Sequence, residues 1–176
     1  MGKERVKMKK IICKKEYDTE ASSIVKKFTS GEFGSADGYE ETLFVTEGGN
    51  YFLYTNGGTE SPYKKEDIKR MITVENYKEE LKGLCCVEIS GESCANCLTL
   101  MPILKSLCDA RDDVRLVHIE ADYTTLALME ALEVEKVPTI LLVEDGEIFA
   151  RCTGFQPEEI LELWLDAKLE ERKASK

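Results

Sequence analysis

The sequence lacks any long hydrophobic run. Within its 176 residues, no apolar stretch approaches the roughly 20 residues that cross a bilayer as a helix. The basic segment 1–15 contains only the apolar pair Ile11-Ile12, whereas a secretory signal needs an apolar core of about 7–15 residues. We therefore expect neither a membrane span nor an export signal, and we predict a cytoplasmic protein.

The C-terminal part is short of positive charge. Residues 74–176 carry 11 basic and 22 acidic side chains, and the chain has a formal net charge of −10. Because phosphate binding needs a basic surface, we do not expect nucleic acid as a partner of this part. With 43% hydrophobic and 33% charged residues, the chain is typical of a globular protein, and its length suits one ordinary domain with a small additional module.

The seven cysteines do not have the pattern of a disulfide-bonded framework. Their number is odd and we expect a reducing compartment, so most of them should be free thiols. Four are expected to pack as small hydrophobic side chains: Cys85, Cys86, Cys108 and Cys152. Cys94 and Cys97 differ, because they form a C-x-x-C motif. A zinc site would need a second pair in range, and Cys85-Cys86 lack the C-x2–4-C spacing, so no metal is expected.

Two styles of sequence meet near residue 70. Residues 1–68 are expected to form a small module with a β-hairpin and one helix. The strands of the hairpin are predicted at residues 42–45 and 51–54, around a Gly-Gly-Asn turn. The apolar residues between Asp18 and Phe28 have helical spacing, which predicts a helix there.

Residues 69–176 alternate between strands and helices. A buried strand over 84–90, a helix over 94–110 and a buried strand over 114–119 form a βαβ unit, whose two strands should be parallel. Asp145-Gly146 is typical of a two-residue hairpin turn. The other elements expected here are strands over 70–72, 140–144 and 147–152, and helices over 74–82, 124–132 and from Pro157 onward. The pattern therefore predicts an α/β domain.

The helix expected over 94–110 places Cys94 in its first turn. There, unpaired backbone N–H groups and the positive end of the helix dipole favour the thiolate and lower its pKa from about 8.5 toward 7 or below. Cys97 follows one turn later on nearly the same face, close enough to form a disulfide. This arrangement predicts that Cys94 is a nucleophile that attacks a substrate disulfide and that Cys97 resolves the mixed disulfide.

Several short motifs accompany this cysteine pair in a fixed order. They are Cys94-Ala95-Asn96-Cys97, Pro102 in the same helix, Val137-Pro138-Thr139, Asp145-Gly146-Glu147, Thr153-Gly154, and a closing helix that contains Trp164. With these motifs, residues 69–176 resemble the thioredoxin family. The resemblance implies the thioredoxin fold, a central mixed sheet flanked by helices. It also implies an oxidoreductase that reduces protein disulfides, is itself reduced by a thioredoxin-reductase-type donor, and needs no cofactor.

The resemblance also implies roles for single residues. The peptide bond before Pro138 should be cis, with the Val137 backbone pairing with an extended substrate segment and Gly154 leaving room for it. Glu88 stands six residues before the first cysteine, where the family keeps a buried aspartate that handles the proton of the resolving thiol. A carboxyl group on an apolar strand has a raised pKa, which suits a proton acceptor for Cys97. The alternative is a purely structural Glu88.

The sequence departs from the family pattern around the cysteine pair. Ser90 and Ser93 stand where the family has tryptophan, and Ala95-Asn96 replaces Gly-Pro. His118, the only histidine, stands where the family often has lysine. It is either a packed strand residue or a group that shifts the pKa of Glu88 or of the resolving thiol. The departures keep a second hypothesis open, a thioredoxin-fold protein-binding module with weak or vestigial redox activity.

Overall fold

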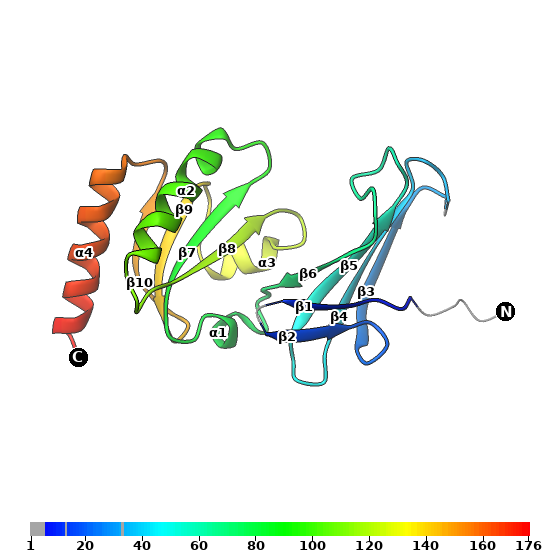
Figure 1. Ribbon diagram of the computed structural model, residues 1–176, viewed down its shortest axis with the longest axis horizontal. Helices are drawn as coiled ribbons and strands as arrows, with labels where there is room; N and C mark the ends of the chain where they lie inside the picture. Colours follow the sequence, from blue (N-terminus) through cyan, green and yellow to red (C-terminus); the bar gives the residue numbers. More distant parts are fainter. Residues whose placement is uncertain (1–5, 13, 33) are drawn as a thin grey trace. The chain divides into compact units, whose positions relative to one another are not determined.

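The computed structural model describes residues 6–12, 14–32 and 34–176. The chain folds into two compact units, and the boundary along the sequence lies between Met71 and Ile72. Figure 1 follows the chain through both of them. Each unit is described by itself below.

The N-terminal unit is built from β-strands. Its strands are β1 (Lys9–Ile12), β2 (Lys15–Asp18), β3 (Ser23–Ser30), β4 (Tyr39–Val45), β5 (Tyr51–Gly57) and β6 (Asp67–Met71). The strands β3, β4, β5 and β6 form an antiparallel sheet in that order, and β1 pairs with β2 in a separate two-stranded sheet. The expected hairpin is confirmed as β4 and β5. Gly49 in its turn has a φ of 80°, which a residue without a Cβ adopts readily.

The helix expected between Asp18 and Phe28 is wrong, because β3 occupies most of that segment. β3 is an edge strand that pairs with β4. Its apolar side chains Ile24, Val25 and Phe28 are about half exposed, so their helical spacing does not mark a buried helix face. β-Branched Ile24 and Val25 fit strand geometry better than a helix, and the ladder with β4 satisfies the backbone.

Aromatic side chains form the core of the N-terminal unit. Phe52 stacks on Phe44 with the ring centroids 5.1 Å apart, and Tyr17 meets Phe52 edge-to-face at 5.5 Å. Tyr54 and Ile68 are buried in the same cluster. Since Tyr17 lies on β2 and the others lie on the four-stranded sheet, this cluster holds the two sheets of the unit together.

The C-terminal unit contains a mixed sheet and four helices. Its elements are α1 (Tyr77–Glu80), β7 (Leu84–Gly91), α2 (Ala95–Asp109), β8 (Arg115–Ala121), α3 (Leu126–Ala131), β9 (Thr139–Glu144), β10 (Glu147–Thr153) and α4 (Glu158–Ala174). The strand order is β10-β9-β7-β8. β7 and β8 are parallel, which confirms the predicted βαβ unit, whereas the β7–β9 and β9–β10 pairs are antiparallel.

The helices cover both faces of this sheet (Figure 1). On one face, Cys86 of β7 packs with side chains of α2 and α4. On the other face, Val87 and Ile89 pack with side chains of α3 and with Leu81, which follows α1. Successive side chains of a strand point to opposite faces, so Glu88 lies on the face that α2 covers.

Two expectations near the junction of the units are wrong. The strand expected over 70–72 as the first element of the α/β part is β6, which pairs with β5 in the N-terminal sheet. The helix expected over 74–82 is shortened to the single turn α1. Before it, the Asn76 side-chain oxygen accepts a hydrogen bond from the Thr73 N–H at 2.7 Å, which fixes residues 73–76 as a turn. The other elements expected in this unit are present.

Candidate active site

Cys94 and Cys97 lie at the N-terminus of α2 and are joined by a disulfide. Their Cα atoms are 5.2 Å apart. Cys94 is the N-cap residue in an extended conformation, and Ser93 before it has a left-handed φ of 57°, so the chain turns from β7 into α2 here. The Cys97 backbone N–H donates a hydrogen bond to Cys94 Sγ at 3.2 Å. Cys94 Sγ thus occupies the place that a side-chain oxygen takes in an ordinary N-cap.

The two cysteine residues differ in accessibility. Cys97 is 3% exposed, whereas Cys94 is partly exposed and Ala95 and Asn96 beside it are exposed. An incoming disulfide can therefore reach Cys94 more easily than Cys97. In the reduced protein, a Cys94 thiolate would be stabilised by the hydrogen bond from the Cys97 N–H and by the positive end of the α2 dipole.

A buried carboxyl group lies on the α2 side of β7. Glu88 is fully buried, and both of its oxygens are hydrogen-bonded. The Ser90 hydroxyl donates to Oε1 at 2.5 Å, and His118 Nδ1 lies 2.8 Å from Oε2. His118 is the direct partner of Glu88 in the parallel β7–β8 ladder, and its side chain is 48% exposed. The structure thus brings Glu88 and His118 together.

The hydrogen bond to Glu88 raises the pKa of His118, and Glu120 contributes in the same direction while burial opposes it. Because the pKa in the folded protein is raised, the pair contributes stability that is fully present below the unfolded value of about 6.5. This stability is lost as the pH rises through the higher folded value. We expect Glu88→Gln to lower the pKa of His118, measured by NMR titration of the single imidazole. An unchanged titration curve would contradict the pairing.

The predicted cis peptide bond between Val137 and Pro138 is confirmed. The Pro138 carbonyl accepts a hydrogen bond from the Gly154 N–H at 2.8 Å. Apart from the two chain neighbours of Gly154, no described residue has an atom within 4 Å of the place where a Cβ of Gly154 would be. At the end of β7, a Cβ on Gly91 would lie 2.9 Å from Val137 Cγ2. Val137, Pro138 and Gly154 therefore gather at the end of β7 from which the chain continues to Cys94.

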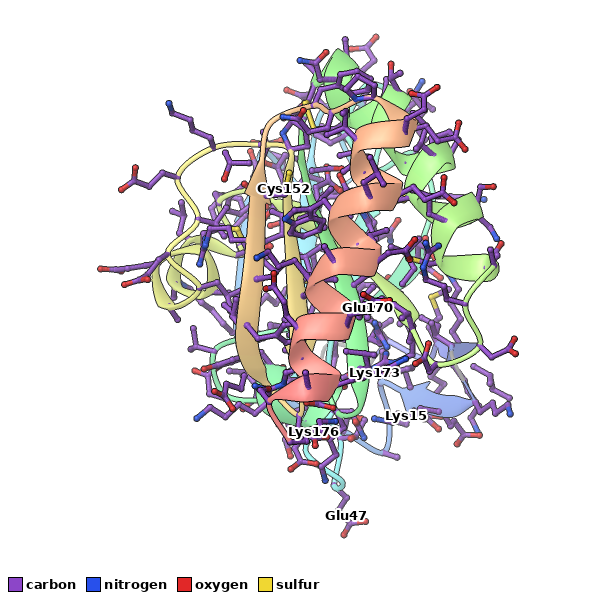
Figure 2. The ribbon with its side chains drawn as sticks, turned by 90° about the vertical axis from the view of Figure 1, so that its left-hand side faces the viewer. Lys15, Glu47, Cys152, Glu170, Lys173 and Lys176 are labelled. Atoms are coloured by element: carbon purple, nitrogen blue, oxygen red, sulfur yellow. A yellow bond between two sulfur atoms is a disulfide. The ribbon has the colours of Figure 1, made fainter. Side chains whose placement is uncertain are left out.

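The other described cysteines are free thiols. Cys85, Cys86 and Cys108 are buried, and Cys152 is partly buried on β10 beside α4 (Figure 2). Burial raises the pKa of the Cys85 and Cys152 thiols, and the neighbouring Cys108 thiol together with burial raises that of Cys86. Such thiols are weak nucleophiles, which fits a packing role. Cys13 lies outside the described residues.

The described residues offer neither a cluster of metal ligands nor a membrane-spanning helix. They contain no group of three or more His, Cys, Asp or Glu side chains arranged to hold a metal ion. In the same part of the chain, no helix is long and apolar enough to cross a membrane. The cysteine pair and the groups around Glu88 and Pro138 form the candidate active site.

Sequence reasoning missed two contributors to this site. The sequence marks Ser90 only as a departure from the tryptophan of the family, yet its hydroxyl donates a hydrogen bond to Glu88. The alternation of side chains along a strand could have indicated this contact, because residues two apart share a face. The close approach of Gly91 to Val137 has no such local signal, since it depends on how β7 and the loop before β9 pack.

A family profile and the sequences of known proteins match the C-terminal part of the chain. The profile of the Thioredoxin family matches residues 68–167. A thioredoxin of Chlamydia pneumoniae is 32% identical over 93 residues, which cover 52% of this chain and 90% of that protein. A thioredoxin of Staphylococcus haemolyticus is 29% identical over 102 residues, covering 56% and 95% respectively. The solved structure of a thioredoxin variant from Halobacterium salinarum superposes with a TM-score of 0.46 and 24% identity, over 53% of this chain and 81% of that one.

The C-terminal unit has an α/β fold in which a buried central strand leads into a helix capped by a C-x-x-C pair. This is the thioredoxin fold that the sequence predicts. The chain belongs to the thioredoxin family, with an additional β-containing region at its N-terminus. At the level of the family it is a thiol–disulfide oxidoreductase.

Proposed function

We propose that this protein reduces disulfide bonds of other proteins through a dithiol–disulfide cycle of Cys94 and Cys97. The observation that supports the proposal best is the Cys94–Cys97 disulfide at the N-terminus of α2, with the Cys97 N–H directed at Cys94 Sγ. The same two residues can thus exist as a closed disulfide, while the helix terminus favours the thiolate of the accessible partner. The named thioredoxins among the relatives support the same chemistry.

In the first step, the Cys94 thiolate attacks one sulfur of the substrate disulfide. A bond between Cys94 Sγ and that sulfur forms, the substrate S–S bond breaks, and the departing substrate thiolate takes up a proton. The Cys97 N–H and the α2 dipole stabilise the attacking thiolate. The partial exposure of Cys94 admits the substrate.

In the second step, Cys97 attacks Cys94 Sγ and displaces the second substrate sulfur. The Cys97 proton passes to the Glu88 carboxylate, which lies on the face of β7 that α2 covers. The Cys94–Cys97 disulfide closes, and the second substrate thiolate is protonated. Over both steps, two electrons move from the enzyme dithiol to the substrate, and the two substrate thiolates take up their protons from solvent. An external donor must return the two electrons.

The residues around Pro138 form the proposed substrate-binding surface. The backbone of Val137 would pair with an extended segment on either side of the substrate cysteine. Gly154 would leave space for that segment, since the position of its missing Cβ is open. Val137 is itself partly exposed, as such a contact requires.

We further propose disulfide-containing proteins as substrates and a thioredoxin-reductase-type protein as the electron donor, in a cytoplasmic setting. We also propose that residues 1–68 and 69–176 are separate domains. The two compact units and the restriction of the family match to residues 68–167 support this division. Because β6 pairs with β5 as far as Met71, the boundary between the two domains would lie at Met71, three residues beyond position 68.

The proposed function is tested by equilibrating the protein with glutathione buffers of stepped redox potential. Thiol trapping and mass spectrometry then identify the cysteines that are linked. We expect a reversible disulfide between Cys94 and Cys97 with a strongly reducing potential, while the buried thiols react with alkylating agents only after unfolding. A much more oxidising value would contradict a reductase. Failure to close this disulfide would favour a binding module instead.

A further inference from the structure

The carboxyl group of Glu88 has no direct contact with solvent through which it could exchange a proton. Its side chain is fully buried, and its carboxylate is held between the Ser90 hydroxyl and the His118 imidazole. His118 is the titratable one of these two partners, and it is 48% exposed. A proton that reaches Glu88 from inside the protein therefore meets solvent through a side chain that can itself bind and release a proton.

The imidazole of His118 suits such an exchange because its two nitrogens are distinct. Nδ1 faces Glu88 Oε2 at 2.8 Å. When Glu88 is ionised, Nδ1–H donates to the carboxylate, and when Glu88 is protonated, its O–H can donate to Nδ1. The same hydrogen bond thus persists with the proton on either side, while Nε2 on the opposite edge of the ring can exchange with water.

We propose that His118 is a proton relay that connects Glu88 with solvent during the closing of the Cys94–Cys97 disulfide. This inference rests on the proposed function, in which Glu88 receives the Cys97 proton. His118 touches neither the substrate nor the reacting sulfurs, so it acts through Glu88. Its position in the β7–β8 ladder, directly opposite Glu88, keeps it there without a mobile loop.

The proton balance of the relay is simple. Before the step, Glu88 is ionised and His118 is an imidazolium, which donates Nδ1–H to Glu88 Oε2 and carries a second proton on Nε2. When Cys97 gives its proton to Glu88, the negative charge that stabilises the imidazolium is lost, and His118 gives up its Nε2 proton to water or to a buffer base. One proton thus leaves the pair for each one that enters it. Neither a bond to sulfur nor a redox change is involved, and the reverse order of steps serves the reduction of the disulfide.

The charged groups around His118 keep this exchange near neutral pH. Glu88 approaches from β7, and Glu120 lies two residues along β8 on the same face. Both carboxylates raise the pKa of His118, while burial lowers it. An imidazole with an ordinary pKa of about 6.5 that is raised in this way can both bind and release protons close to pH 7.

The relay is tested with the full chain by stopped-flow mixing of the reduced protein with a chromogenic aromatic disulfide. The first coloured thiolate reports the attack by Cys94, and the second, concentration-independent phase reports the attack by Cys97. We expect His118→Gln to slow the second phase about tenfold near pH 7, to remove the histidine inflection from its pH profile, and to leave the first phase unchanged. Added imidazole should restore part of the second-phase rate in this variant, which a merely structural role of His118 would not produce.

Two further variants separate the relay from the proposed function. Glu120→Gln removes a charge next to His118 but no step of the path, so the second phase should change less than about twofold while its inflection moves to lower pH. Glu88→Gln should slow the second phase at least as much as His118→Gln. The relay alone would be overturned if Glu88→Gln slowed the second phase while His118→Gln kept the wild-type rate. It would also be overturned if imidazole failed to restore the second-phase rate of His118→Gln. Wild-type second phases in both variants would overturn the role of Glu88 as well.

Discussion

Replacing Cys94 with serine should lower the rate of protein disulfide reduction by roughly a thousandfold or more, because a serine hydroxyl is not ionised at neutral pH and forms no disulfide. The measurement is turnover of a peptide disulfide with a dithiol as electron donor. Cys152→Ser is the matched control, since Cys152 is a partly buried thiol of raised pKa on the edge strand β10. Its turnover should stay within about twofold of the wild type.

Cys97→Ser gives the complementary result. Cys94 can still attack, but no thiol remains to displace the substrate, so a mixed disulfide on Cys94 should accumulate and be seen as added mass. If Cys94→Ser kept full turnover, the redox cycle would be assigned to the wrong residues. The thioredoxin fold would then serve binding rather than catalysis.

The second large effect concerns stability. Leu104→Ala should lower the free energy of unfolding of the C-terminal unit by about 2–5 kcal/mol, because it leaves a cavity in the layer between α2 and the sheet. Leu104 is fully buried, whereas Leu163 on α4 is 68% exposed. Leu163→Ala is therefore the control, with an expected change within about 0.5 kcal/mol.

Denaturant unfolding followed by tryptophan fluorescence suits this comparison. Trp164, the only tryptophan of the chain, packs against the same core cluster as Leu104, so its signal reports on the C-terminal unit. Equal midpoints for Leu104→Ala and Leu163→Ala would contradict the packing described for this layer. A lower midpoint for Leu104→Ala with an unchanged slope would agree with a pure loss of stability.

The fold of the C-terminal unit could be predicted because its signals are local. The apolar run of β7 marks a strand buried on both faces, and Asp145-Gly146 marks the turn between β9 and β10. In the N-terminal unit, the apolar residues of β3 are half exposed, so their spacing carries no information about a buried face. The membership of β6 in the N-terminal sheet depends on pairing with β5, which no local pattern specifies.

The candidate site also combines features that local sequence predicts with contacts that depend on strand pairing. The spacing of Cys94 and Cys97 and the turn before them predict a disulfide at a helix terminus, and this disulfide is present. The sequence also singles out Glu88 and His118, but it leaves open whether His118 packs or acts on Glu88. Only the parallel register of β7 and β8 brings these two side chains into contact.

The 5.2 Å between the Cα atoms of Cys94 and Cys97 turns thiol exchange here into a competition between an internal thiol and dissolved ones. Well-oriented intramolecular reactions reach effective molarities of about 10⁵ M or more, far above any concentration of a dissolved thiol. In the proposed cycle, a small-molecule thiol that forms an adduct with Cys94 is therefore displaced by Cys97 before a second molecule arrives. The protein should persist as the open dithiol or the closed disulfide, and adducts with small thiols should be short-lived.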